Sequence, residues 1–337
     1  MKIVFVFGGS GFIGTNLIKL LLHKKLKVFN FDIVSYASVP EKFKKYKNKS
    51  NYFFKKINMN KFKEVEKLFI KYKPSYIYNL AAMSHVDRSI DAPKKTIENN
   101  ILSTLNLLEN IRINGSNKNF KRLIHLSTDE VYGDVLKSSK EKDALNPSSP
   151  YSSSKASSDM LIKSYNKTFK LPAIIIRACN NFGPYQFPEK FIPTIISNFK
   201  ANKKIPIYGN GKQNREWIYV NDFCELLINF MHKGLEGNIY NVGSGKKISN
   251  IKLINKIFKI LKIDNPLKNY LTHVKDRPGH DKNYSLDSSK AKRILKNYKI
   301  NSFDKNLLET IKWYSDNQKW LKFTKKNYKG QRLGVVK

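Results

Sequence analysis

The sequence predicts a doubly wound α/β fold of the Rossmann type, with a parallel sheet and a smaller C-terminal α/β part. Three observations lead to this prediction. A glycine-rich turn lies close to the N-terminus, strand-like and helix-like segments alternate over the first half, and Gly- and Pro-containing stretches interrupt the pattern after about residue 178. Strands that alternate with helices form a parallel sheet covered by helices.

The first predicted unit is a strand, a turn and a helix. Residues 3–7 form a continuous apolar run typical of a buried strand, and residues 15–23 have helical spacing. The turn between them contains Gly8-x-x-Gly11-x-x-Gly14, and residues 27–32 read as the second strand. This order is the β-α-β opening of a dinucleotide-binding domain.

The remaining elements follow from the same two periodicities. We expect further strands at 76–80, 123–127 and 173–177, and helices at 61–71, 96–111 and 150–169. The Lys-rich residues 41–56 read as a solvated surface loop. The predicted domains are a cofactor-binding domain over 1–178, to which 220–243 return, a substrate-binding domain over 179–219 and 244–320, and a basic tail over 321–337.

The charge of the chain is strongly positive, at +37 for 337 residues. A basic surface attracts polyanions without reading their sequence. The 63 basic residues include only eight arginines, however, and the lysines are scattered from Lys2 to Lys337. Such scatter is typical of codon bias in an AT-rich genome, so we expect no specific nucleic-acid partner.

Cysteine usage and hydropathy exclude several other classes. Cys179 and Cys224 are the two cysteines, and their spacing does not suggest a disulfide framework or a metal site. No apolar run approaches the length of a membrane span, and the N-terminal run stops at Gly8 without a signal-peptide pattern. We therefore expect a cytoplasmic protein without a metal and without a membrane partner.

The glycine turn predicts a dinucleotide cofactor. Its glycines allow a tight turn, a close approach of the pyrophosphate to the backbone, and close packing of the following helix, whose N-terminus favours negative charge. Asp32 ends the second strand, where a carboxylate accepts hydrogen bonds from ribose hydroxyls and repels a 2′-phosphate. The predicted cofactor is therefore NAD, although Asp32 could also serve only as a turn or capping residue.

A tyrosine and a lysine four residues apart open the helix predicted at 150–169. Pro150 suits the first helical position, and Tyr151 and Lys155 then share one helix face. A nearby ammonium stabilises a phenolate, so we expect Tyr151 to act as a base toward a sugar hydroxyl at neutral pH.

Two adjacent acids follow the strand predicted at 123–127. Asp129 and Glu130 come after Ser127 and Thr128, at the carboxyl edge of the sheet where such folds bind ligands. A simple dehydrogenase has no need for this pair. The pair could also be an exposed acidic turn.

The sequence resembles the extended short-chain dehydrogenase/reductase superfamily, whose glycine turn GxxGFIG appears here as residues 8–14. Within it the chain is most similar to dTDP-glucose 4,6-dehydratases. The matching segments run through nearly the whole chain: 80–82, 84–89, 127–133, 180–190, 215–217 and 276–281. The Asp-Glu pair after Thr128 and the run 180–190 are the most specific of them.

The resemblance implies a hydro-lyase reaction and a role for each catalytic residue. Tyr151 would take the proton of the sugar 4-hydroxyl while NAD oxidises C4, with Thr128 hydrogen-bonding nearby and Lys155 holding the nicotinamide ribose. Glu130 would remove the C5 proton, and a protonated Asp129 would protonate the departing C6 hydroxyl. Hydride return to C6 would give dTDP-4-keto-6-deoxyglucose and water.

The resemblance also implies binding residues. The cofactor residues are Gly8, Gly11, Phe12, Ile13, Gly14, Asp32, Asn58, Leu80, Ala81, Ser127, Tyr151 and Lys155. The substrate residues are Ser84, Thr128, Asn180, Glu189, Lys190, Arg215, Asn250 and Arg277, with the two arginines on the diphosphate, because a guanidinium matches phosphate oxygens. Helices 96–111 and 150–169 would form the contact of a homodimer.

Two other functions remain open. An epimerase, a decarboxylase or a dehydratase acting on a UDP-, CDP- or GDP-sugar would share the glycines, Tyr151 and Lys155. A non-enzymatic protein that binds NAD or a nucleic acid would use the basic surface instead.

Overall fold

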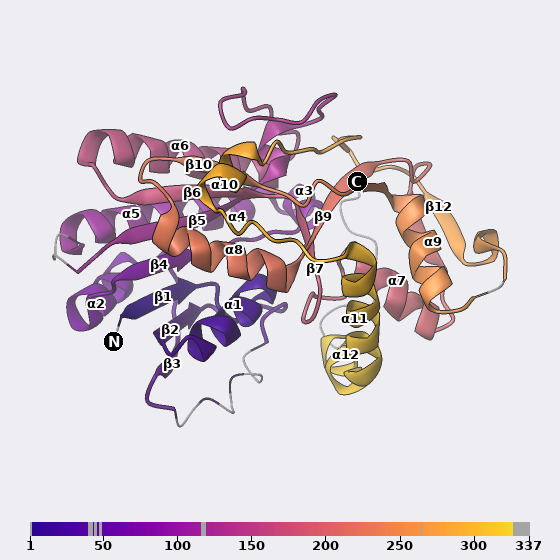
Figure 1. Cartoon of the computed structure of the whole chain (residues 1–337), viewed down its shortest axis with the longest axis horizontal. Coiled ribbons are helices and arrows are strands. Elements are labelled where there is room, and N and C mark those ends of the chain that lie inside the picture. The colour runs from indigo at the N-terminus through magenta and orange to yellow at the C-terminus, as the bar shows by residue number, and fades with distance from the viewer. Residues whose placement is uncertain are drawn as a thin grey trace.

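The computed structural model describes residues 2–39, 43, 46, 49–115, 119–263 and 265–325. The predicted basic tail lies outside these residues from 326 onward. A seven-stranded parallel sheet, in the order β10-β6-β5-β4-β1-β2-β3, forms the larger part of the molecule (Figure 1). Its strands are β1 (Ile3–Phe7), β2 (Lys27–Asp32), β3 (Tyr52–Lys56), β4 (Tyr76–Asn79), β5 (Arg122–Thr128), β6 (Ala173–Ala178) and β10 (Ile239–Val242). The predicted fold class is confirmed.

Helices cover both faces of this sheet. The central strands β6, β5, β4 and β1 are therefore buried on both sides. One apolar cluster joins the sheet to α1 (Phe12–His23) and α8 (Val220–Lys233). A second joins the opposite face to α2 (Phe62–Tyr72), α5 (Ser103–Asn114) and α6 (Pro150–Phe169). The chain returns to the sheet through α8 and β10.

The smaller part contains two short sheets and its own apolar cluster. The three-stranded sheet has the order β11-β9-β7, and β12 pairs with β8. Its elements are β7 (Asn180–Phe182), α7 (Phe191–Lys200), β8 (Ile205–Tyr208), β9 (Asn214–Tyr219), β11 (Lys247–Ser249), α9 (Asn250–Ile260), a 3-10 turn (Leu267–Asn269), β12 (Leu271–Val274), α11 (Phe303–Asp316) and α12 (Gln318–Lys325). A further helix, α10 (Ser289–Ile294), packs beside β10.

The helix predicted at 96–111 is interrupted. The structure has α3 (Val86–Asp91), α4 (Pro93–Ile97), a π-helical turn (Glu98–Leu102) and then α5. Asn100 lies in the π turn, where its side chain accepts a hydrogen bond from Met83 N (2.8 Å) and donates one to Ser154 Oγ (2.8 Å). These long-range hydrogen bonds draw the backbone inward, which helical periodicity alone does not reveal.

The loop predicted at 41–56 is also wrong in its second half. Residues 52–56 form β3, the edge strand beside β2. Only Tyr52 of this strand is buried, and the four residues after it are exposed. The strand begins with three aromatic residues, which favour strands, but the lysines on both sides of them led to the loop prediction.

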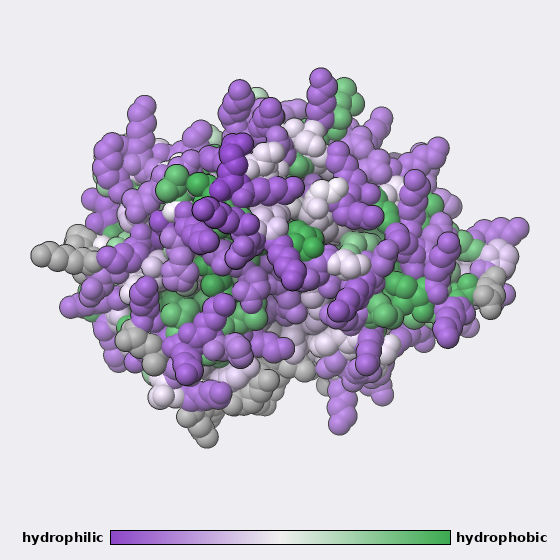
Figure 2. Space-filling view, viewed as in Figure 1, coloured by the Kyte–Doolittle hydropathy of each residue, from purple (hydrophilic) through white to green (hydrophobic). Residues whose placement is uncertain are grey.

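Neither a membrane span nor a metal cluster occurs in the described residues. No described helix is long and apolar enough to cross a membrane. The same part of the chain holds no group of three or more His, Cys, Asp or Glu side chains able to bind a metal ion. Hydrophilic side chains cover most of the face seen in Figure 2, with smaller apolar areas between them.

Candidate active site

A cavity of about 600 Å³ lies between the larger sheet and the smaller part. Its walls come from the carboxyl ends of the parallel strands and from the segments that follow β6. Of the residues predicted from the sequence, the cavity is lined by Gly8, Gly11, Phe12, Ile13, Gly14, Asp32, Asn58, Leu80, Ala81, Ser84, Ser127, Thr128, Glu130, Tyr151, Lys155, Asn180, Glu189, Lys190, Arg215, Asn250 and Arg277. Asp129 does not line it.

The glycine turn forms a cradle that side chains would fill. Gly8 has a φ of +75°, and a Cβ there would lie 2.7 Å from backbone atoms of Ala81. A Cβ on Gly14 would lie 2.5 Å from Gly8 O. Gly11 is the N-cap of α1 and, having no side chain, makes no side-chain hydrogen bond to the free N–H groups at the positive end of the helix. The cradle therefore fits the pyrophosphate of a dinucleotide.

Asp32 ends β2 beside this cradle. Its carboxylate accepts hydrogen bonds from Ser10 N (3.0 Å), Val34 N (2.7 Å) and Ser38 Oγ (3.0 Å). Burial raises the pKa of Asp32, while these three donors oppose the rise. The donors fix the carboxylate at the cavity wall, and its contact with a ribose stays a prediction.

Tyr151 and Lys155 lie in the first turns of α6. Ser149 and Ser152 form a capping box, and Pro150 begins the helix as expected. Burial raises the pKa of Tyr151, and so do the nearby Glu130 and Asp129, whereas a hydrogen bond with Thr128 lowers it. Burial and the two acids favour the neutral phenol in the chain without a cofactor, so the phenolate at neutral pH stays a prediction.

The two acids occupy a 3-10 turn (Asp129–Tyr132) directly after β5. Thr128 Oγ1 donates to Asp129 Oδ1 (3.2 Å) and accepts from Glu130 N (3.3 Å). Asp129 is 2% exposed, and its Oδ2 has no hydrogen-bond partner within the described residues. The alternative of an exposed acidic turn is thus excluded for Asp129.

The two carboxyl groups differ in their electrostatic surroundings. Burial raises the pKa of Asp129 well above its ordinary value, and the carboxylates of Glu130 and Glu216 raise it further. Burial also raises the pKa of Glu130, but Arg277, Arg215 and Lys190 oppose that rise. The arrangement favours a protonated Asp129 beside a Glu130 surrounded by cations.

The cations on the far side of the cavity are held by protein groups. Arg277 Nη1 lies 3.4 Å from Asp87 Oδ1, while Arg277 Nε is buried without a hydrogen-bond partner among the described residues. Arg215 donates through Nη1 and Nη2 to the carbonyl oxygens of residues 214, 281 and 282. A buried guanidinium with an unused donor suits an anionic group of the ligand.

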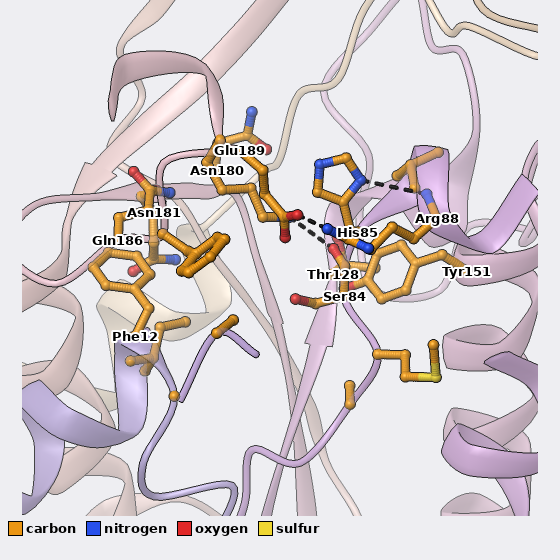
Figure 3. Close-up of a pocket in the computed structure, with 18 of the residues that line it drawn as sticks. Phe12, Ser84, His85, Arg88, Thr128, Tyr151, Asn180, Asn181, Gln186 and Glu189 are labelled. Carbon is orange, nitrogen blue, oxygen red and sulfur yellow. Dashed lines mark hydrogen bonds and ion pairs between the residues drawn. The ribbon is translucent and has the colours of Figure 1, made fainter. Parts of the chain in front are cut away.

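Three side chains that sequence reasoning did not combine form a clasp across the cavity, which we call the Tyr36–Arg88–Glu189 clasp. Arg88 Nε donates to Glu189 Oε2 (2.8 Å), Tyr36 Oη donates to Glu189 Oε1 (2.7 Å), and the Arg88 guanidinium lies 4.0 Å from the Tyr36 ring centre. Figure 3 shows Glu189 and Arg88 facing each other. Lys190 donates to Ser84 O (2.8 Å).

Sequence reasoning missed the clasp because its members come from three distant segments. Arg88 and Glu189 lie in the matched segments 84–89 and 180–190, and this match was the one indication in the sequence that both residues belong to the site. Both Glu189 oxygens accept protein hydrogen bonds here, so contact of Glu189 with a substrate stays a prediction.

The comparisons with known proteins agree with this architecture. The family model for GDP-mannose 4,6 dehydratase matches residues 5–310. The chain is 39% identical to the dTDP-glucose 4,6-dehydratase of Escherichia coli over 362 residues, covering all of both chains.

Solved structures extend the likeness. The dTDP-glucose 4,6-dehydratase of Bacillus anthracis in complex with NAD superposes with a TM-score of 0.88 at 34% identity, covering 96% of this chain and all of that one. The UDP-glucose 4-epimerase of Thermotoga maritima with UDP-glucose has a TM-score of 0.86 at 25% identity, with coverage of 94% and 100%. The chain therefore belongs to the GDP-mannose 4,6 dehydratase family, within the extended short-chain dehydrogenases/reductases that act as NAD-dependent nucleotide-sugar dehydratases and epimerases.

Proposed function

We propose that this protein is a dTDP-glucose 4,6-dehydratase, a hydro-lyase that converts dTDP-glucose to dTDP-4-keto-6-deoxyglucose and water. The observation that carries the proposal is the pair Asp129 and Glu130, one buried acid and one cavity acid, beside Tyr151 and Thr128. Oxidation alone needs the tyrosine and the lysine. Removal of water needs a base and an acid as well.

The glycine cradle, Asp32, Asn58, Leu80 and Ala81 would hold NAD. When bound, NAD supplies the oxidation at C4, the later reduction at C6, and a positive charge that favours the phenolate of Tyr151. The phenolate would accept the proton of the sugar 4-hydroxyl, with the Thr128 hydroxyl beside the phenol oxygen.

Glu130 would act as the base of the elimination, and it would return that proton to C5 when C6 is reduced. A ketone at C4 acidifies the C5 proton, and the cations around Glu130 oppose the rise in its pKa that burial causes. Asp129, held protonated by its buried surroundings, would donate its proton to the C6 hydroxyl as it leaves. Because Asp129 does not line the cavity, a rotation of its side chain or a relay through the Thr128 hydroxyl would complete that transfer.

Arg215 and Arg277 would bind the diphosphate of the substrate, with Asn250 toward the nucleotide and Asn180, Lys190 and Ser84 toward the sugar. The buried, unused Nε of Arg277 supports this assignment. The choice of dTDP over UDP, CDP or GDP follows from similarity to relatives named for dTDP-glucose.

The second candidate is a 4-epimerase, favoured by the fold it shares with UDP-glucose 4-epimerase. An epimerase needs no acid pair, so the buried Asp129 and the cavity-facing Glu130 favour the dehydratase.

Mass spectrometry of the products tests the proposal. The purified protein is incubated separately with dTDP-glucose, UDP-glucose, CDP-glucose and GDP-mannose. We expect the loss of one water from dTDP-glucose. A dTDP product of unchanged mass with an inverted centre would identify an epimerase, and water loss from another nucleotide sugar alone would refute the proposed nucleotide.

We also infer a homodimer, built by α5, α6 and the π turn before α5. Four large apolar side chains of these elements are exposed: Leu102, Ile113, Met160 and Phe169. Burial of such side chains against a two-fold copy would form a four-helix contact.

A further inference from the structure

A chain of three buried polar side chains runs behind the cavity wall, from β4 through β5 to α6. Asn79 ends β4, His125 lies in β5, and the two residues are paired in register. Lys155 Nζ lies 3.2 Å from His125 Nε2, and His125 Nδ1 lies 3.1 Å from Asn79 Nδ2. His125 is completely buried. Nothing in the proposed reaction uses it.

Hydrogen-bond chemistry allows one protonation pattern for these three side chains when Lys155 is an ammonium. An ammonium group only donates, so Nε2 of His125 must accept, and the ring must carry its proton on Nδ1. That proton needs an acceptor, and Asn79 Oδ1 is a buried oxygen with no hydrogen-bond partner in the described part of the chain. Exchanging the two amide atoms of Asn79, so that Oδ1 takes the place of Nδ2 beside the ring, gives the Nδ1 proton this acceptor. Burial and the Lys155 charge lower the pKa of His125 well below its ordinary value, consistent with a neutral ring.

The neutral imidazole of His125 acts on the Lys155 ammonium differently from a carboxylate. It orients the Lys155 ammonium and stabilises its charged form without cancelling its charge. The one acid that raises the pKa of Lys155 is Asp159, one turn farther along α6, and Asp159 is paired with the buried Arg177 at 2.9 Å. His125 is therefore the hydrogen-bond partner that the structure provides for the ammonium itself.

We propose that His125 is a positioning residue of this site: its neutral imidazole, fixed by Asn79, holds the Lys155 ammonium charged and one helical turn from Tyr151. The structural part of this proposal, the hydrogen bonds among Asn79, His125 and Lys155, concerns only the protein without ligands. Its effect on NAD binding and on the reaction rests on the proposed function.

Nitrogen NMR of protein labelled with 15N in histidine tests the structural part without any sugar or cofactor. The chain has six histidines, and the missing signal of His125→Gln assigns the ring. We expect a neutral ring with the proton on Nδ1 from pH 6 to 9, and an Nε2 signal that shifts as Lys155 titrates near pH 8. The shift should vanish in Lys155→Met. A proton on Nε2, or an Nε2 signal unaffected by Lys155→Met, would overturn the proposal.

The pH dependence of NAD binding tests the functional part. His125→Leu removes the acceptor, so Lys155 should lose its proton at lower pH, and the alkaline midpoint of NAD affinity should fall by roughly one pH unit. His125→Gln keeps an amide oxygen for Nζ and should restore most of that shift. An unchanged midpoint in His125→Leu refutes the positioning role. If His125→Leu fails to fold, the wild-type and Lys155→Met spectra decide. If the protein gives the expected NMR and NAD-binding results but does not convert dTDP-glucose, the proposed function is refuted and this inference is not.

Discussion

Asp129 and Glu130 are neighbours in the chain, yet their side chains have different surroundings. The 3-10 turn after β5 sends Glu130 to the cavity, while Asp129 turns inward toward Thr128. The side chains of two consecutive residues thus point in different directions, because the backbone of the 3-10 turn rotates between them. The sequence identified the pair, but it did not reveal that only one of the two acids faces the cavity.

Glu130→Gln is expected to permit oxidation at C4 and to stop the elimination, because an amide cannot accept the C5 proton. With dTDP-glucose, reduced cofactor should accumulate and be visible by absorbance, while water loss should fall by at least roughly a hundredfold. Asp129→Asn is the matched control, since it keeps the base and removes the acid. Full dehydration by Glu130→Gln would remove that residue from its role.

Lys155 gives the stability of the chain a measurable dependence on pH. Burial lowers its pKa from 10.5 to about 8 in the folded chain. Between these values the unfolded chain holds a proton that the folded chain has released, so the stability that Lys155 contributes rises with pH, by about 1.4 kcal/mol per unit.

Urea unfolding of the wild type and Lys155→Met at several pH values checks this prediction. The difference in unfolding free energy, wild type minus variant, should be flat below about pH 8 and should rise above it. A difference that stays constant up to pH 10 would mean that the lysine is not desolvated in the folded chain.

At the scale of elements, the clasp joins three segments that the sequence leaves far apart. Tyr36 follows β2, Arg88 lies in α3, and Glu189 precedes α7. The clasp therefore ties the cofactor side of the cavity to the smaller part. Glu189 is almost fully buried and Arg88 only partly so, a geometry in which loss of one partner leaves a costly charge.

Glu189→Gln should weaken the clasp and speed NAD release by roughly tenfold, because the amide forms a weaker hydrogen bond with the Arg88 guanidinium. Release can be followed by dilution of the NAD-loaded protein into a scavenging enzyme. Glu66→Gln, which removes the exposed Lys63–Glu66 ion pair on α2, serves as the control and should leave the rate unchanged. Equal rates in the two variants would contradict a role of the clasp in retention.

The elements that could be predicted from the sequence are those with strong periodicity. Residues 3–7, 27–32 and 150–169 match β1, β2 and α6 at both ends. The misassigned segments were decided by tertiary contacts: Asn100 draws the π turn inward, and β3 exists because β2 offers it an edge. The periodicity of a segment does not show that Asn100 would bond to Ser154 or that β3 would pair with β2.

At the scale of the whole molecule, the charge of +37 should produce polyanion binding without specificity. We expect affinity for DNA to fall linearly on a logarithmic salt scale and to be equal for unrelated sequences. Fluorescence anisotropy with two unrelated duplexes, from low to high salt, measures both. A strong preference for one duplex at high salt would support a nucleic-acid function instead.

The proposed dimer predicts a change in mass on mutation of two exposed apolar residues, Leu102 in the π turn and Met160 in α6. Met160→Lys together with Leu102→Lys should convert the dimer to a monomer, because two charges on each copy would be buried at the contact. Light scattering after gel filtration gives the mass. Leu308→Lys, an equally exposed leucine on α11, should leave it unchanged. A monomeric wild type would refute the dimer.

By itself the sequence determined the parallel α/β fold, the glycine cradle, the Tyr151–Lys155 pair and the acids after β5, because each depends on residues that are close together in the chain. Only the tertiary structure decided which acid faces the cavity, that Glu189 is clasped by Tyr36 and Arg88, and that Lys155 is held by His125. These outcomes depend on burial and on partners that lie 30 to 153 positions away, and such pairings arise only when the strands are aligned in one sheet and the smaller part closes over it.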